Sequence, residues 1–237
     1  MRKVLVTGAT QGIGRAVAAA FVQNGDEVIV HGRADAEKAG RACADIGAAR
    51  AVTADLREKG AAAALYALTG PVDCLILNAS VQYKERWEDI TEETLEEQID
   101  VNIKSTLRLM QLYYPAMKAN GFGRIVTIGS VNQRRCHPEL SLYAATKCAV
   151  MSLVRNIAKE AAPYGVTVNN VSPGAIDTPR NDKALADRAF YEKVRACIPM
   201  GRIGRPADCA GAVLFLCGDG GAYITGADIA VDGGMGL

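Results

Sequence analysis

The chain has 237 residues, of which 49% are hydrophobic and 22% are charged, and its formal net charge is +1. This composition is typical of a globular protein and excludes an intrinsically disordered chain. The near-neutral charge provides no general attraction to nucleic acid or to an anionic membrane surface, so we expect neither as a partner.

The seven cysteines and the N-terminus bear on the compartment. An odd number of cysteines without a C-x-x-C pair disfavours a disulfide framework and a structural zinc site. We therefore expect reduced thiols in a cytoplasmic protein, and no metal centre. The N-terminal residues MRKVLVTG lack the long apolar run of a signal peptide, and no segment approaches the ~20 apolar residues that span a bilayer.

Short runs rich in β-branched and aliphatic residues recur along the chain. Most of them are almost continuously apolar, as expected for strands that are buried on both faces of a parallel sheet. The predicted strands are residues 4–7, 27–31, 50–53, 72–78, 124–128, 166–171 and 227–231.

Helical patterns separate these runs. Residues 14–24 are alanine-rich and end at an Asn-Gly pair, which is a helix stop signal. Thr91 is a predicted N-cap, and apolar residues follow it at helical spacing as far as Met110. Further helices are predicted at residues 142–162 and 206–217.

The alternation of strands and helices predicts an α/β fold. We expect a Rossmann-type, doubly wound, three-layer sandwich with a seven-stranded parallel sheet. No linker or repeat interrupts the pattern, so one domain is predicted over residues 1–237. Residues 177–205 are the least regular segment, and we expect short helices there that form a lid over a site.

The sequence TGATQGIG, residues 7–14, lies where the first strand meets the first helix. Glycines allow a tight turn and a close approach of the backbone to a ligand, and free N–H groups at a helix start can bind a pyrophosphate. The spacing differs from G-x-G-x-x-G, and a glycine turn can be purely structural, but this position favours nucleotide binding. The expected contacts are Gly8, Thr10, Gln11, Gly12, Ile13 and Gly14.

The end of the second predicted strand carries Arg33 and no acidic residue. An acidic side chain at this point hydrogen-bonds the 2′-hydroxyl of NAD, whereas an arginine can pair with a 2′-phosphate. The sequence therefore predicts NADP(H) rather than NAD(H). The alternative is that Arg33 is a solvated residue near Asp35.

Tyr143 and Lys147 are four residues apart in a predicted helix, which places them on one face. The ordinary pKa of tyrosine is about 10, and a nearby cation lowers it by stabilising the phenolate. Such a tyrosine can donate a proton to a carbonyl or accept one from an alcohol. The alternative is a half-buried tyrosine beside a lysine that reaches to solvent.

Taken together, the motifs resemble those of the classical short-chain dehydrogenase/reductase family over essentially the whole chain. The matching features are T-G-x-x-x-G-x-G at residues 7–14, Asn102, Ser130 thirteen residues before the tyrosine, Tyr143-x-x-x-Lys147, Pro173-Gly174 and VDGG at residues 231–234.

The resemblance implies a catalytic role for four residues. Ser130 would hydrogen-bond the substrate oxygen, and Tyr143 would be the general acid or base. Lys147 would lower the tyrosine pKa and bind the nicotinamide ribose. Asn102 would anchor a water in a proton path; its alternative is an amide that caps a helix irregularity.

The resemblance also implies cofactor contacts beyond the glycine turn, namely Asp55, Leu56, Asn78, Ala79, Pro173, Gly174, Ile176 and Thr178. Asp55 could instead be the N-cap of the next helix, and Thr178 a surface hydroxyl. One segment departs from the family: where N-N-A-G is usual, residues 77–80 read L-N-A-S. The backbone path and the hydrogen bonds of that turn are therefore open.

The loops after the fourth and fifth predicted strands are polar and basic, with Arg86, Arg134 and Arg135 among their residues. They suggest a small polar substrate, such as a hydroxy or keto acid or a sugar derivative, with an anionic group near these arginines. The alternative is that the arginines face solvent or a neighbouring subunit.

These features predict an NADP(H)-dependent oxidoreductase that transfers a hydride between the nicotinamide and a carbonyl or secondary alcohol. Alternatives are a 3-oxoacyl-carrier-protein reductase, a sugar or polyol dehydrogenase, and a non-catalytic cofactor-binding regulatory subunit. The resemblance further implies a homotetramer, and the small residues of segment 223–237 suit a subunit interface.

Overall fold

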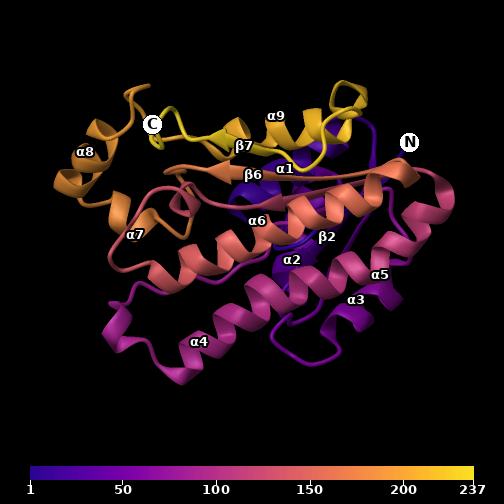
Figure 1. The fold of residues 1–237 in the computed structure, drawn as a ribbon, viewed down its shortest axis with the longest axis horizontal. Coiled ribbons are helices and arrows are strands. Elements are labelled where there is room, and N and C mark those ends of the chain that lie inside the picture. The colour runs from indigo at the N-terminus through magenta and orange to yellow at the C-terminus, as the bar shows by residue number, and fades with distance from the viewer.

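A seven-stranded parallel sheet forms the centre of the computed structural model, which describes all 237 residues (Figure 1). The strand order is β3-β2-β1-β4-β5-β6-β7. The strands are β1 Lys3–Val6, β2 Glu27–Gly32, β3 Arg50–Thr53, β4 Cys74–Leu77, β5 Gly123–Ile128, β6 Val166–Pro173 and β7 Asp228–Val231. The predicted α/β sandwich and all seven predicted strands are confirmed, with ends that differ by at most two residues.

Helices cover both faces of the sheet. The helices α1 and α9 pack together on one face, and α3, α5 and α6 cover the other (Figure 1). The helices are α1 Gly12–Gln23, α2 Ala36–Ile46, α3 Ala61–Thr69, α4 Glu92–Ile99, α5 Ser105–Asn120, α6 Ser141–Ala161, α7 Asp182–Leu185, α8 Arg188–Ala196 and α9 Pro206–Cys217.

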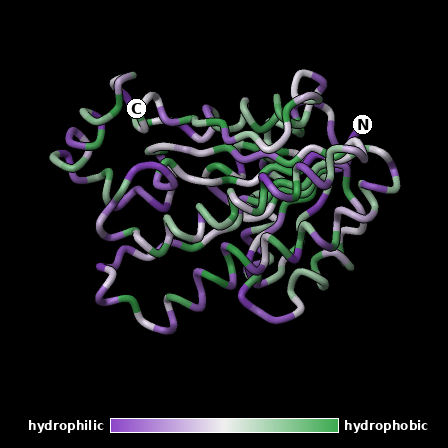
Figure 2. Tube along the Cα trace, in the orientation of Figure 1, coloured by the Kyte–Doolittle hydropathy of each residue, from purple (hydrophilic) through white to green (hydrophobic).

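The continuous apolar runs of the strands follow from this layering. Along β1, Val4 and Val6 join the core beneath α1 and α9, whereas Leu5 joins the core beneath α3, α5 and α6. Successive side chains of a strand point to opposite faces, so a sheet with two covered faces needs apolar residues at every position. Figure 2 shows this concentration of hydrophobic residues at the centre.

The predicted helix after Thr91 is divided. Thr91 is the N-cap, as predicted, and its hydroxyl accepts a hydrogen bond from the Thr94 amide. A π-helical turn, Asp100–Lys104, separates α4 from α5. Such turns interrupt the i→i−4 ladder and often occur at functional sites.

The irregular segment 177–205 contains the short helices α7 and α8, as expected. Neither they nor any other helix of the chain combines the length and the apolar character needed to cross a bilayer. No three His, Cys, Asp or Glu side chains lie close enough together to hold a metal ion.

His31 is buried in β2 and connects three segments of the chain. Its Nδ1 atom accepts a hydrogen bond from the Gly8 amide (3.2 Å), so Nε2 carries the proton and donates to the Ala54 carbonyl (3.0 Å). Burial lowers the pKa of His31 to about 4. The neutral imidazole therefore fixes the glycine turn relative to the ends of β2 and β3.

This histidine makes folding stability dependent on pH. Unfolded His31 takes up a proton below about pH 6.5, whereas the folded form resists protonation until about pH 4, so its contribution to stability falls as the pH drops between these values. Between pH 7 and pH 5, we expect the free energy of unfolding of the wild type to fall by about 2 kcal/mol more than that of His31→Gln. Urea unfolding curves at both pH values measure this, and parallel losses would contradict it.

Candidate functional site

A cleft with a volume of about 620 Å³ opens at the carboxyl ends of β1, β2, β4, β5 and β6. The strand order reverses between β1 and β4, because β1 is followed on one side by β2 and on the other by β4. In open α/β sheets, ligands bind at such a switch point. The glycine turn, the end of β2 and segment 177–205 all contribute to the lining.

The glycine turn forms the floor of one half of the cleft. Gly8 and Gly12 have φ angles of 63° and 56°, which disfavour any residue with a side chain. A Cβ atom on Gly14 would lie 2.5 Å from both Asn78 Nδ2 and Gly8 O. Gly14 therefore acts by close packing and does not line the cleft, whereas Gly8, Thr10, Gln11, Gly12 and Ile13 do.

The atypical L-N-A-S segment keeps its hydrogen bonds to this turn. The Thr7 hydroxyl accepts from the amides of Asn78 (2.9 Å) and Ala79 (3.0 Å). Asn78 Nδ2 donates to the carbonyls of Thr7 (2.9 Å) and Gly8 (3.0 Å). Leu77 is buried in the core at the end of β4. Asn78 and Ala79 line the cleft as expected, so the leucine extends the core without disturbing the turn.

The cleft is strongly basic where β2 and β3 end. Arg33, Lys38 and Arg57 line it together with Asp55. Arg57 donates hydrogen bonds to both Asp55 oxygens, and this pairing holds the pKa of Asp55 below its usual value. Arg33 Nε lies 3.8 Å from the same carboxylate. The cluster can accept a phosphate group that approaches from the cleft.

Of these three cations, Lys38 and Arg57 were not predicted from the sequence. Lys38, in the first turn of α2, donates to Gln11 Oε1 (2.6 Å) and so reaches back to the glycine turn. Its signal in the sequence is a basic residue in the first turn of the helix that follows Arg33. Asp55 is not the cap of α3, whose N-cap is Gly60, and Leu56 lines the cleft as expected.

Ser130, Tyr143 and Lys147 meet in the other half of the cleft, and all three are more than 90% buried. Ser130 follows β5, and α6 carries the other two side chains on one face. Lys147 Nζ donates to the Ile128 carbonyl (2.8 Å) and lies 5.5 Å from the centroid of the Tyr143 ring. Three of the four expected catalytic residues, Ser130, Tyr143 and Lys147, thus lie side by side, and Asn102 lies apart from them.

The charges around Tyr143 differ from the expectation. Burial raises the pKa of Tyr143, while the Arg180 guanidinium and the Ser130 hydroxyl act to lower it. Burial, with a smaller contribution from Arg180, lowers the pKa of Lys147 to about 7. The cation whose effect on the phenol is evident is therefore Arg180, and the effect of Lys147 on the phenol stays a prediction.

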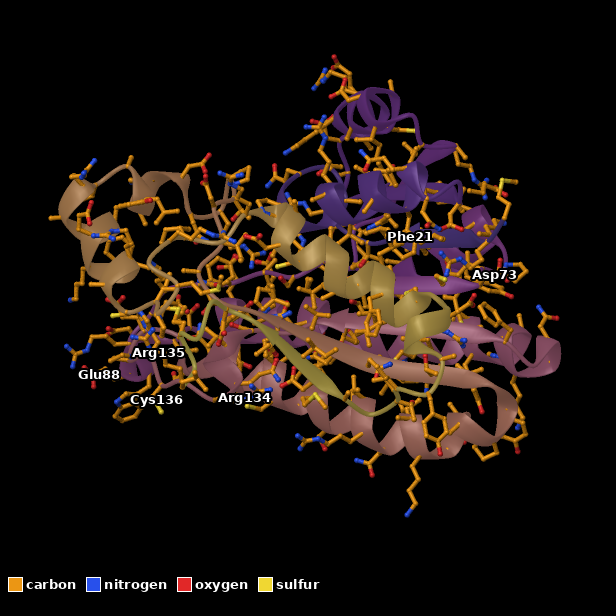
Figure 3. All side chains as sticks on the ribbon, turned by 90° about the horizontal axis from the view of Figure 1, so that it is seen from above. Phe21, Asp73, Glu88, Arg134, Arg135 and Cys136 are labelled. Atoms are coloured by element: carbon orange, nitrogen blue, oxygen red, sulfur yellow. The ribbon has the colours of Figure 1, made fainter.

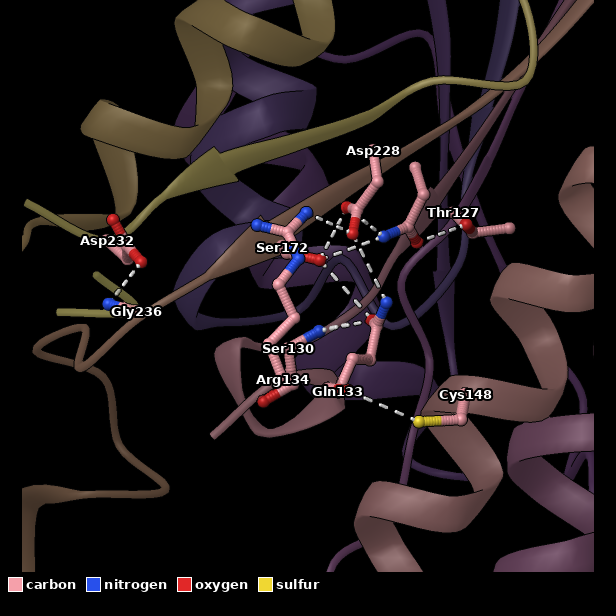
Figure 4. A network of polar contacts seen from close by, with 10 residues as sticks. Thr127, Ser130, Gln133, Arg134, Cys148, Ser172, Asp228, Asp232 and Gly236 are labelled. Carbon is pink, nitrogen blue, oxygen red and sulfur yellow. Dashed lines mark hydrogen bonds and ion pairs between the residues drawn. The ribbon is translucent and has the colours of Figure 1, made fainter. Parts of the chain in front are cut away.

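A buried polar network fixes the position of Ser130 (Figure 4). Gln133 Oε1 accepts from the Ser130 amide (2.9 Å) and lies 3.3 Å from the Ser172 hydroxyl oxygen. Ser172 and Asn170 both donate to Asp228 Oδ1, at 2.6 and 2.7 Å. Buried polar groups that are fully hydrogen-bonded give a rigid arrangement, so the network holds Ser130 from behind.

Asn102 lies outside the cleft lining, within the π-helical turn. Its Oδ1 atom accepts from the Val81 amide (2.9 Å), and its Nδ2 atom donates to the Val81 carbonyl (3.0 Å) and the Thr146 hydroxyl (3.1 Å). The side chain therefore joins the loop after β4 to the catalytic helix. It is a positioning residue at a helix irregularity, and its place in a proton path stays a prediction.

The loop after β6 completes the cleft. Pro173, Gly174, Ile176 and Thr178 all line it, and their contact with a cofactor stays a prediction. The Thr178 methyl group would lie 3.4 Å from a Cβ atom on Gly12, so this side chain packs over the glycine turn.

The arginines that were expected to bind the substrate are outside the cleft, which corrects that expectation. Arg86 pairs with Glu88 (3.0 Å), and Arg134 pairs with Asp228 (2.5 Å). Figure 3 shows Arg135 beside Cys136, near Glu88, at the periphery of the molecule. Carboxylates of the protein itself offset two of these charges, which the sequence spacing did not reveal.

The arginine that does line this half of the cleft is Arg180, which was not predicted. Its Nη2 atom donates to the Ser80 carbonyl (2.7 Å) and hydroxyl (3.1 Å). Two features of the sequence point to it: Arg180 follows Thr178 by two residues, and Ser80 is one of the atypical residues after β4.

Comparison with known proteins agrees with this geometry. A family model described as enoyl-(acyl carrier protein) reductase matches residues 8–236. The chain is 37% identical to dehydrogenase/reductase SDR family member 4 from Bos taurus, over 97% of this chain and 85% of that protein. It is also 37% identical to the 3-oxoacyl-[acyl-carrier-protein] reductase MabA of Mycobacterium tuberculosis, over 100% of this chain and 93% of that protein.

Solved structures give the same result. A 3-oxoacyl (acyl-carrier-protein) reductase from Agrobacterium tumefaciens with NADP bound superposes with a TM-score of 0.91, at 38% identity over 98% of this chain and 93% of that chain. A short chain dehydrogenase/reductase family protein superposes with a TM-score of 0.93, at 36% identity over 99% of this chain and 97% of that chain. The chain therefore belongs to the short-chain dehydrogenase/reductase family of oxidoreductases.

Proposed function

We propose that the protein is an NADP(H)-dependent oxidoreductase that interconverts a carbonyl compound and a secondary alcohol, with a small, polar or anionic substrate. The observation that carries the proposal is the meeting of Ser130, Tyr143 and Lys147 in one cleft with a glycine turn. The three side chains can bind an oxygen atom and exchange its proton, and the glycine turn can bind a pyrophosphate.

In the direction of reduction, a nicotinamide held in the cleft would supply the hydride that the carbonyl carbon accepts. The Ser130 hydroxyl donates a hydrogen bond to the carbonyl oxygen, and the Tyr143 hydroxyl gives it a proton. Arg180 stabilises the phenolate that remains, because it favours the charged form of Tyr143. Lys147 binds the ribose next to the nicotinamide. The burial of all three catalytic side chains excludes water from these steps.

The preference for NADP(H) rests on the charge at the far end of the cleft. Arg33, Lys38 and Arg57 surround a single carboxylate, Asp55, which leaves an excess of positive charge for a 2′-phosphate. The 3-oxoacyl reductase from Agrobacterium tumefaciens that resembles this chain is described with NADP bound.

A 3-oxoacyl-carrier-protein reductase is the second candidate. Relatives at 37% identity carry that name, and apolar side chains of α7 and α8, among them Leu185, Phe190 and Val194, line the cleft. We propose that these helices form a lid over the substrate in either case. A non-catalytic regulatory subunit is disfavoured, since nothing would then require Tyr143 and Ser130 to share a cleft.

A homotetramer in a reducing, cytoplasmic environment is also proposed. Phe215 and Tyr223 have exposed aromatic rings near the C-terminal edge of the sheet, where a second subunit could cover them. All seven cysteines are free thiols, which suits a reducing compartment.

Removal of the phenolic hydroxyl tests the chemistry. We expect Tyr143→Phe to reduce turnover of a ketone by NADPH about 100- to 10,000-fold, because the general acid is lost. NADPH binding, measured by fluorescence titration, should change little. The matched control is Tyr164→Phe, which removes an exposed hydroxyl outside the cleft. Retention of activity in Tyr143→Phe would contradict the assignment.

Removal of the Arg33 charge tests the cofactor. We expect Arg33→Ala to weaken NADP⁺ binding about 10-fold, since a charge-assisted hydrogen bond to the 2′-phosphate is lost, and to leave NAD⁺ binding nearly unchanged. Arg41→Ala is the control, because Arg41 lies on α2 outside the cleft. Calorimetric titration measures both affinities, and equal wild-type affinities for the two cofactors would refute the preference.

A further inference from the structure

We propose that Arg180, held in place by Ser80, binds the carboxylate of the substrate, and that the substrate is an oxo acid or hydroxy acid whose carboxylate lies one or two carbons from the reacting carbon. This inference rests on the proposed function and names the substrate class of the same site.

The position of Arg180 is set from the opposite wall of the cleft. Arg180 follows β6, and its Nη2 atom donates to both oxygens of Ser80, which follows β4. The guanidinium thus bridges two loops that are 100 residues apart in sequence. A guanidinium has five N–H donors in a planar fork, and Ser80 uses only those of Nη2. Arg180 also hydrogen-bonds the Tyr143 hydroxyl, and the donors that neither Ser80 nor Tyr143 uses are available to a carboxylate.

Arg180 has no counter-ion in the protein. It takes part in none of the ion pairs of the structure. By contrast, Arg86 and Arg134, which were expected near the substrate, are each paired with a protein carboxylate. An arginine without such a partner inside a cleft is available to a ligand.

The charge of the whole cleft supports an anionic ligand. Asp55 is the only aspartate or glutamate that lines it, and Arg57 already holds this carboxylate at the cofactor end. The substrate end is lined by Lys84, Lys147 and Arg180, with no acidic side chain to balance them. The one cation–π contact of the Lys84 ammonium is with the Phe190 ring. A neutral ketone would leave this positive charge without compensation.

The distance from Arg180 to the reacting group limits the substrate. The Arg180 guanidinium lies within hydrogen-bonding reach of the Tyr143 hydroxyl, and both side chains line the cleft with Ser130. A carboxylate that is bound to Arg180 therefore places a carbonyl one or two carbons away within reach of Tyr143 and Ser130. A longer separation would carry the carbonyl past the phenol.

Ser80 gives this chain a means of orienting the arginine. The position is a glycine in the N-N-A-G pattern that the family usually shows, and the serine hydroxyl adds a second acceptor for Nη2. A fixed guanidinium loses less side-chain entropy on binding a ligand than a mobile one, which raises affinity. The residue that departs from the family is thus in contact with the residue that we assign to the substrate.

The test compares charged and neutral substrates in three proteins. Wild type, Arg180→Gln and the control Arg86→Gln are assayed with NADPH against 2-oxobutanoate, acetoacetate, their methyl esters, and the neutral thioester S-acetoacetyl-N-acetylcysteamine. Arg86 loses the same charge from a loop outside the cleft. Ser80→Gly is added to release Arg180 without removing it. Urea unfolding curves establish that all variants are folded.

We expect the wild type to prefer at least one oxo acid over its ester. Arg180→Gln should lower kcat/KM for that acid about 10- to 100-fold more than for the ester, the value of a charged hydrogen-bonded pair, because both substrates lose the effect of Arg180 on Tyr143 and only the acid loses its carboxylate contact. Ser80→Gly should give a smaller loss for the acid, and Arg86→Gln none. Equal losses for acid and ester in Arg180→Gln would overturn the inference, as would faster wild-type turnover of the esters or the thioester.

Binding separates this inference from the proposed function. Oxamate, a non-reducible 2-oxo acid analogue, is titrated calorimetrically into the wild type and Arg180→Gln, each saturated with NADP⁺. Binding that Arg180→Gln abolishes would support the carboxylate site even if no substrate of the panel were reduced. Turnover of neutral ketones without oxamate binding would leave the proposed function standing and refute the role of Arg180.

Discussion

The cleft depends on the hydrogen bonds between Thr7 and Asn78 at the carboxyl ends of β1 and β4. These bonds close the glycine turn against the neighbouring strand, where a side chain at Gly8 or Gly14 would collide with backbone or with Asn78 itself. The strand order reverses at this point, so the chain leaves the two strands in opposite directions and opens a cleft. The contacts proposed between the glycine turn and the cofactor follow from this local geometry.

The reactive half of the cleft is a place where burial and positive charge act together. Burial opposes ionisation of both Tyr143 and Lys147, and Arg180 favours the phenolate while it disfavours the ammonium. The Asp228 network behind Ser130 and the Asn102 contacts behind α6 hold these groups in place without entering the cleft. The chemistry is thus confined to a few side chains, and the surrounding polar groups are occupied with one another.

The sequence predicted the fold and the two motifs of the site because their signals are local. Apolar runs such as that of β1 identify buried strands, and Tyr143 and Lys147 share a helix face through their spacing alone. The π-helical turn at Asn102 and the pairing of Arg134 with Asp228 could not be predicted, because they depend on partners far away in the sequence. The same reason hid Arg180, whose partner Ser80 is 100 residues away.

The central claim is that this cleft carries a hydride between a nicotinamide and a carbonyl carbon. The most direct measurement supplies the purified protein with NADPH that is deuterated at its transferable hydrogen, together with the carbonyl panel, and analyses the products by mass spectrometry. The account predicts one deuterium on the former carbonyl carbon of an alcohol product, and at least about 100-fold less of this product with Tyr143→Phe in the same time. NADPH binding without deuterium in any product would contradict it.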